Sequence, residues 1–225
     1  MKFSCITGSM GNIGDRFLLE GYKESISPED RLDAISKIDC LTGVELCYDI
    51  NGYESNADIV NAALKKLNIF AAGTNGPLAG QRIFKFGSLT NPDPDIRKKA
   101  LQYARDTIDF TRKTGGQFVN LWLGQDGFDY SFQTDYTKQW KLMVEGLREI
   151  CDYAPDLKIA LEFKQREPRN RCFFDHPNTS LLVACDVERK TLALQLILAT
   201  CFNAAQILPR LSKFVPDTRC STTSI

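Results

Sequence analysis

Short apolar runs alternate with longer amphipathic segments along most of the chain. The short runs are typical of strands, and the longer segments repeat apolar residues every three or four positions, as helices do. The short runs predict strands at Phe3–Thr7, Val44–Tyr48, Ile69–Ala72, Phe118–Leu123 and Leu157–Phe163. The longer segments predict helices at Pro28–Ile38, Ala57–Leu67, Pro94–Thr114 and Asp135–Tyr153.

Local signals mark the start of the first helix and the inner faces of two others. Ser27 can cap the first helix, Pro28 suits its first position, and Glu29 and Asp30 place acids in its first turn. The apolar stripe of the second helix consists of Ile59, Val60, Ala63, Leu64 and Leu67. The inward residues of the last one are Trp140, Met143, Val144, Leu147 and Ile150.

The alternation of strand and helix indicates a parallel sheet covered by helices. It fits either a closed (β/α)8 barrel or an open doubly wound sheet. The loop Gly8-Ser9-Met10-Gly11-Asn12-Ile13-Gly14 lacks the G-x-G-x-x-G spacing of a dinucleotide site. We therefore predict an α/β fold, namely an incomplete (β/α)8 barrel with about five to six βα units. A complete barrel of this kind usually needs about 250 residues.

The composition of the chain indicates which kinds of partner it can have and in which cellular compartment it occurs. Lys and Arg total 28 and Asp and Glu total 28, so charge favours neither a nucleic-acid nor a membrane partner. The eight cysteines contain no C-x-x-C pair, and the N-terminal segment is too polar for a signal peptide, so we expect reduced thiols in a cytoplasmic protein. The late apolar run Leu192–Cys201 is about half as long as a membrane span and predicts part of a core.

Glu162 and Lys164 are the candidate catalytic pair. They are two residues apart at the end of a predicted strand, so their side chains point to the same face. In an α/β barrel, the reacting groups lie at this end of the strands. A carboxylate can bind a hard cation, and a lysine can donate to a sugar oxygen or stabilise an enediolate. The alternative is a structural ion pair at a strand end.

Trp122 and His176 have more ambiguous positions. Trp122 ends a predicted strand beside Gln125 and can form an apolar wall against a sugar ring, or it can belong to the core. His176 is the chain's single histidine, and its place in Asp175-His176-Pro177-Asn178 predicts a turn or helix entry. A histidine-rich metal cluster is therefore excluded.

Three motifs occur in order along the chain: Phe84-Lys85-Phe86-Gly87-Ser88-Leu89-Thr90, Trp122-Leu123-Gly124-Gln125-Asp126-Gly127 and Leu161-Glu162-Phe163-Lys164-Gln165-Arg166-Glu167-Pro168. They resemble, respectively, the F-K-x-G-x-x-T, W-G-G-R-E-G and E-P-K-P-x-E-P motifs of the xylose isomerase-like superfamily of sugar isomerases and epimerases. The resemblance implies a TIM barrel that isomerises or epimerises a sugar or sugar phosphate, with a divalent metal (Mg, Mn or Co), and a possible homo-oligomer.

The resemblance also implies roles for single residues. Glu162 would be the first metal ligand, Lys164 would contact the substrate oxygen and assist proton or hydride transfer, and Trp122 would shape the sugar pocket. The remaining implied substrate-binding residues are Asn75, Gln81 and Gln125. Gln81 stands where the family pattern has a histidine, and glutamine can donate a hydrogen bond to a sugar but cannot act as a base.

The C-terminal segment departs from the family pattern. We predict a barrel portion at residues 1–190 and an atypical segment at 191–225, because the later sequence loses the βα pattern and the acids and histidine that complete the family's metal site. We interpret the sequence from about residue 190 as foreign to the barrel, after a frameshift or an altered exon. The alternative is a shortened but genuine protein whose last segment forms one helix and a loose end.

Two hypotheses of function remain. The chain is a metal-dependent isomerase or epimerase, or it is a non-catalytic remnant that lacks the downstream metal ligands. They differ in whether Asp175, Asp186, Glu188 or Asp217 comes within about 2.5 Å of a metal held by Glu162. A barrel nuclease of the related apurinic-site class is disfavoured, since that chemistry needs several histidines and a basic face.

Overall fold

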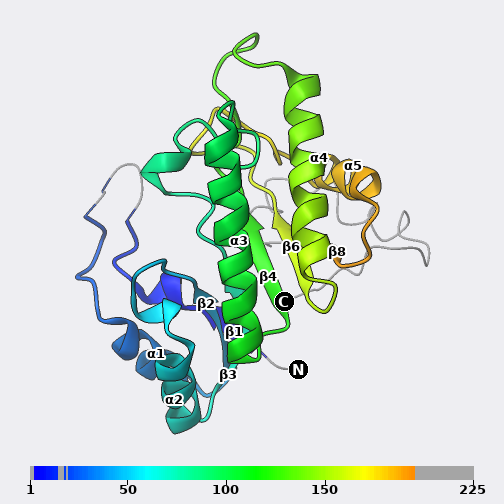
Figure 1. The fold of residues 1–225 in the computed structure, drawn as a ribbon. Helices are drawn as coiled ribbons and strands as arrows, with labels where there is room; N and C mark the ends of the chain where they lie inside the picture. Colours follow the sequence, from blue (N-terminus) through cyan, green and yellow to red (C-terminus); the bar gives the residue numbers. More distant parts are fainter. Residues whose placement is uncertain (1–2, 15–17, 19, 196–225) are drawn as a thin grey trace. The chain divides into compact units, whose positions relative to one another are not determined.

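The computed structural model describes residues 3–14, 18 and 20–195 (Figure 1). The chain divides into two compact units. Unit 1 comprises Met1–Pro77 and Asp106–Val119, and unit 2 comprises Leu78–Arg105 and Asn120–Ile225. Residues 196–225, which make up most of the predicted atypical segment, lie outside the described residues. Each unit is described by itself below.

The described strands confirm the predicted α/β fold. Six of them form one sheet in the order β1-β2-β3-β4-β6-β8, which follows the chain without a reversal. A doubly wound sheet reverses its strand order at a switch point, whereas a (β/α)8 barrel adds each strand beside the previous one. The order therefore fits an incomplete barrel.

None of the helices in the described residues is long and apolar enough to cross a membrane.

Unit 1 contains the first three strands and the helices that cover them. Its elements are β1 (Phe3–Ile6), η1 (Thr7–Met10), α1 (Pro28–Ser36), β2 (Leu41–Cys47), η2 (Tyr53–Ser55), α2 (Ala57–Leu67) and β3 (Phe70–Asn75). The strand pairs β1–β2 and β2–β3 are parallel. As predicted, the Ser27 side chain accepts a hydrogen bond from Asp30 N, and Pro28 begins α1. Asn56 caps α2 in the same way, and Asn68 ends it in the left-handed conformation.

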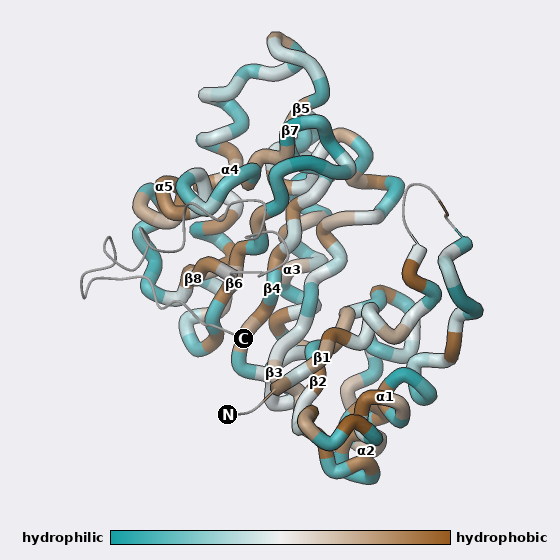
Figure 2. Tube along the Cα trace, turned by 180° about the vertical axis from the view of Figure 1, so that it is seen from behind, coloured by the Kyte–Doolittle hydropathy of each residue, from teal (hydrophilic) through white to brown (hydrophobic). Residues whose placement is uncertain are grey.

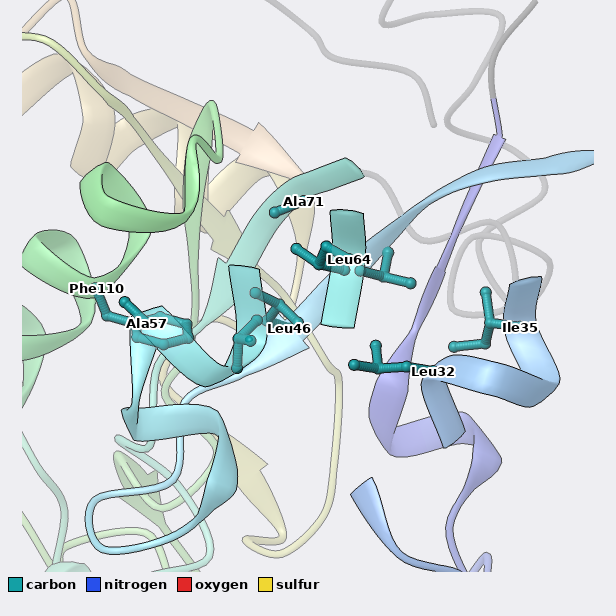
Figure 3. Close-up of a cluster of buried hydrophobic side chains, with 9 residues drawn as sticks. Leu32, Ile35, Leu46, Ala57, Leu64, Ala71 and Phe110 are labelled. Carbon is teal, nitrogen blue, oxygen red and sulfur yellow. The ribbon is translucent and has the colours of Figure 1, made fainter. Parts of the chain in front are cut away.

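A hydrophobic core joins α1, α2 and the sheet within unit 1. Figure 3 shows Leu32 and Ile35 from α1 and Leu64 from α2 among its buried side chains. Figure 2 shows both helices carrying hydrophobic and hydrophilic residues, as one-sided burial requires. The prediction that Ile59 faces inward is wrong, because its side chain is 50% exposed. The buried stripe runs through Ala57, Val60 and Leu64, and Ile59 lies to one side of it.

Unit 2 contains the later strands and helices. Its elements include η3 (Arg82–Phe84), β5 (Gly127–Phe128), α4 (Tyr136–Tyr153), β6 (Lys158–Glu162), β7 (Arg171–Cys172), α5 (Pro177–Val187) and β8 (Leu192–Gln195). Helix α3 (Pro94–Thr114) and strand β4 (Phe118–Trp122) contribute residues to both units. Helix α4 buries Met143, Val144, Leu147 and Ile150 as predicted, whereas Trp140 is only partly buried and donates its Nε1 to Asp186.

The sequence patterns did not predict strands β5, β7 and β8, and of helix α5 they predicted only the possible entry at His176. Helix α5 follows His176, and β8 pairs with β6 in parallel, with Ile159 opposite Leu192. Strands β5 and β7 form a short antiparallel ribbon that joins the loops after β4 and β6. The foreign origin of the sequence from about residue 190 stays a prediction, but its first residues still complete a sixth parallel strand.

Candidate functional site

The candidate site lies at the carboxyl ends of β4 and β6 in unit 2. These strands are neighbours in the sheet, and each supplies a polar side chain to the same point. Asn120 on β4 donates from Nδ2 to Glu162 Oε2 on β6 at 2.7 Å. Asn120 is buried and Glu162 is partly buried. The predicted catalytic carboxylate is therefore held by a neighbouring amide.

Burial raises the pKa of Glu162 above its ordinary value. The hydrogen bond from Asn120 and the positive charge of Lys164 act in the opposite direction, since both stabilise the carboxylate. Burial outweighs them. The pKa of Glu162 is thus closer to neutral pH than that of an exposed glutamate, and its carboxyl group is better suited to take up and release a proton.

Lys164 lies directly after β6, where three contacts fix its position. Its Nζ lies 3.2 Å from Glu167 Oε2 and 5.5 Å from the centre of the Trp122 ring. Its backbone N–H donates to Phe174 O at 2.9 Å. The ammonium side chain keeps 35% of its surface exposed, so a ligand can still reach it. Lys164 forms its ion pair with Glu167, which leaves the carboxylate of Glu162 to Asn120.

Trp122 combines an apolar ring with a buried donor. A Cβ added to Gly124 would lie 2.7 Å from the indole, so only glycine lets the backbone pack this closely on the ring. Among the described residues, Nε1 of Trp122 is buried and has no hydrogen-bond partner. An apolar face next to a cationic group suits the mixed surface of a sugar.

The other predicted substrate-binding residues have separate places. Gln125 accepts a hydrogen bond from Gly80 N at 2.9 Å, so its side chain joins the loops after β4 and β3. Gln81 follows in the second of these loops, directly before η3. Asn75 ends β3 in unit 1, where its Nδ2 donates to Leu46 O at 3.4 Å. Within unit 2 the structure brings Glu162, Lys164 and Trp122 together, and substrate contact by all of these residues stays a prediction.

The described residues do not supply a complete metal site. No group of three or more His, Cys, Asp or Glu side chains that could hold a metal occurs among them. Asp175 accepts from Thr179, Asp186 accepts from Trp140, and Glu188 ends α5. The last two lie at the helix end that leads into β8, away from the carboxyl end of β6. The fourth candidate, Asp217, lies outside the described residues.

His176 has the position that the sequence predicts. It is the residue before α5, and its carbonyl accepts from Ser180 N at 3.3 Å. Its side chain makes no capping hydrogen bond.

Sequence analysis did not identify two charged residues that the fold makes prominent. Glu54 is buried in η2 of unit 1, and burial raises its pKa to about 7, although the nearby Thr7 hydroxyl and Cys47 backbone act to lower it. Arg169 of unit 2 lies in the hydrophilic segment before β7, which is almost wholly teal in Figure 2. One buried glutamate and one arginine in a polar loop have no periodic or spacing signal, so sequence alone does not distinguish them from solvated charges.

Comparisons with known proteins agree with this architecture. The family model for the xylose isomerase-like TIM barrel matches residues 32–184. A xylose isomerase of Thermus thermophilus is 33% identical over 95 residues, which cover 40% of this chain and 24% of that protein. A xylose isomerase of Thermus caldophilus is 28% identical over 131 residues, covering 56% and 34%. The matched part thus spans about a quarter to a third of these relatives.

Solved structures share the fold at low sequence identity. An AP endonuclease, family 2, from Brucella melitensis has a TM-score of 0.72 at 16% identity and covers 100% of this chain and 80% of that one. A 3-keto-D-glucoside 4-epimerase from E. coli has a TM-score of 0.67 at 13% identity, covering 87% and 73%. The family match includes the strand-end residues Asn120, Trp122, Glu162 and Lys164. The chain therefore belongs to the xylose isomerase-like TIM barrel family.

Proposed function

We propose that this chain is a sugar or sugar-phosphate isomerase or epimerase that acts through Glu162 and Lys164. The observation that carries the proposal is the carboxylate of Glu162, held by Asn120 at 2.7 Å and partly desolvated at the strand ends. The nearby Lys164 and Trp122 supply a cation and an apolar wall. Curated xylose isomerases and solved sugar epimerases among the relatives support the same class of reaction.

The chemistry assigned to this chain's residues is proton transfer next to a carbonyl. Glu162 removes the proton from the carbon beside the carbonyl, and the C–H electron pair forms an enediolate. The ammonium of Lys164 stabilises the negative oxygen, and Trp122 packs on the apolar face of the sugar. Returning the proton to the former carbonyl carbon gives the isomer, while the hydroxyl proton on the deprotonated carbon passes to the former carbonyl oxygen. A solvent proton added to the opposite face of the deprotonated carbon gives the epimer.

The described residues include one candidate ligand for a divalent metal but no complete metal site. Glu162 is the carboxylate that would hold it, and a bound metal would polarise the sugar oxygens. The described residues do not fit a complete coordination sphere, since no group of three suitable side chains occurs among them. The same observation favours the second candidate function, a sugar-binding protein without turnover. A homo-oligomer and a cytoplasmic location stay predictions.

Proton exchange in D₂O tests the proposal directly. The full chain is incubated with aldoses, ketoses and their phosphates, with and without Mn²⁺ or Mg²⁺, and NMR follows replacement of the substrate C–H by deuterium. We expect exchange by the wild type and a loss of at least about 100-fold in Glu162→Gln. Glu145→Gln, on the exposed surface of α4, is the matched control.

Each outcome separates the candidates. Exchange that depends on Glu162 supports the enzyme. Sugar binding by calorimetry without exchange and without an isomer or epimer in the NMR spectrum, with or without metal, supports the non-catalytic protein. Exchange that persists in Glu162→Gln contradicts the assigned role of Glu162, and the absence of both binding and exchange contradicts both functions.

A further inference from the structure

Arg169 is a point of contact for three loops of unit 2. It lies in the loop after β6, and its Nη1 donates to Asp129 Oδ2 at 2.7 Å in the loop after β4. Its Nε donates to Gln125 O at 3.1 Å in that same loop. Its Nη2 donates to Lys85 O in the loop that follows η3. The side chain is only 15% exposed, so these bonds are largely shielded from water.

Asp126 holds the same loops together at a second point. Its carboxylate is fully buried and accepts from Thr90 N at 2.8 Å and Thr90 Oγ1 at 2.7 Å, and also from the backbone and hydroxyl of Ser88. Its backbone O accepts from Phe173 N at 2.9 Å, beyond the β5–β7 ribbon. These contacts explain why the three sequence motifs occur together: their loops bind one another.

The contacts of Arg169 lead directly to the candidate site. Arg169 O accepts from Glu167 N at 2.7 Å, and the Glu167 carboxylate lies 3.2 Å from Lys164 Nζ. Lys164 in turn lies over the Trp122 ring. A shift of Arg169 therefore moves the turn that carries the partner of Lys164.

We propose that Arg169 is a positioning residue, which fixes the turn of Glu167 and thereby the ammonium of Lys164 over Trp122. The proposal rests on the proposed function in that Lys164 is the group positioned for reaction. A guanidinium suits the task because its planar fork donates in three fixed directions at once. A lysine keeps the charge but has a single ammonium on a flexible stem, so it cannot reproduce this geometry.

The test uses Trp122 as a reporter. Replacing the chain's other tryptophan by Trp140→Phe leaves Trp122 as the sole indole. In this background, Arg169→Lys and Arg169→Gln are compared with Arg189→Gln. Arg189 is a matched control because it also forms a two-point pair with a carboxylate, Asp152, but at the end of α5. The readouts are the melting temperature, the fluorescence emission and iodide quenching of Trp122, and the kcat and KM of deuterium exchange.

We expect both Arg169 variants to raise iodide quenching of Trp122 and to shift its emission, while Arg189→Gln changes the melting temperature alone. In the exchange assay, Arg169→Lys lowers kcat by about 10-fold to 100-fold with little change in KM, since misplaced groups lose reactivity more than binding. Asp129→Asn, which weakens one of the three contacts, gives a smaller effect of the same kind.

Wild-type quenching and emission in Arg169→Lys would overturn the proposal. The same applies if Arg189→Gln changes Trp122 as much as the Arg169 variants do. If the wild type neither exchanges a sugar proton nor forms an isomer or epimer, the proposed function fails, and the Trp122 signal still decides the role of Arg169. If Arg169→Gln does not fold, Arg169→Lys and Asp129→Asn decide it, and an unchanged signal in both contradicts it.

Discussion

Asn120 Nδ2 lies 2.7 Å from Glu162 Oε2, and this one contact joins neighbouring strands at their carboxyl ends. It fixes one oxygen of the carboxylate, Oε2. Because an amide donor favours the charged carboxylate, Asn120 partly offsets the effect of burial on the Glu162 pKa. The pair therefore sets both the direction and the proton affinity of the proposed base.

Replacing Asn120 by leucine should raise the pKa of Glu162 further. The substitution removes a hydrogen bond that lowers this pKa and leaves the effect of burial in place. NMR titration of ¹³C-labelled glutamate carboxyls measures the change without requiring activity. Asn61→Leu, in unit 1, is the control, because the Asn61 side chain also donates one hydrogen bond, but to Lys113 O and not to a carboxylate. A pKa that stays constant or falls in Asn120→Leu would contradict the assignment.

Glu54 should make unit 1 less stable as pH rises. Its pKa in the folded chain is raised by burial from the ordinary 4.5 to about 7, so the folded state holds its proton more tightly than the unfolded state. Stability is therefore fully present below pH 4.5 and is lost as pH rises to about 7, by on the order of 3 kcal/mol. Glu54→Gln, which is neutral throughout, should remove this loss.

Urea unfolding at pH 5 and pH 8 measures the effect of Glu54. The variant should gain stability over the wild type at the higher pH and gain less at the lower one. Glu149→Gln, an exposed partner of Arg105, should show no comparable dependence. A wild-type chain with the same free energy of unfolding at pH 5 and at pH 8 would contradict the prediction.

Leu64→Ala and Ile59→Ala should lower the free energy of unfolding by very different amounts, although both residues are on α2. Leu64 is 5% exposed in the core of unit 1, and its truncation should cost about 2 to 5 kcal/mol through lost burial and a cavity. Ile59 is 50% exposed, and its truncation should cost within about 0.5 kcal/mol. Chemical unfolding of the two variants provides the comparison, and equal losses would disprove the assigned helix face.

Asp126→Asn should destabilise unit 2 although the substituent is nearly isosteric. The buried carboxylate accepts from Ser88 and Thr90, and an amide would direct its own N–H groups at those donors. The expected cost is about 2 to 4 kcal/mol. Asp95→Asn, on the exposed surface of α3, serves as the control for loss of charge alone. Hydrogen exchange of the Ser88 and Thr90 amides should increase in the first variant and stay unchanged in the second.

The sequence by itself determined the elements with strong local signals. Helices α2 and α3 have the predicted bounds, since apolar periodicity, capping residues and an initial proline act within a few residues of one another. The alternation of strands with helices also predicted the α/β class, and three motifs predicted that Glu162, Lys164 and Trp122 belong together. Each of these signals is contained in a short stretch of chain.

The tertiary structure alone decided what depends on distant residues. Strand β8 and the β5–β7 ribbon exist through pairing with segments elsewhere in the chain, and their own sequences are too short to predict it. The exposure of Ile59, the burial of Glu54 and the three-loop contacts of Arg169 likewise depend on which segments pack around them. A side chain's identity determines which bonds it can form, and only the fold determines which partners come within reach.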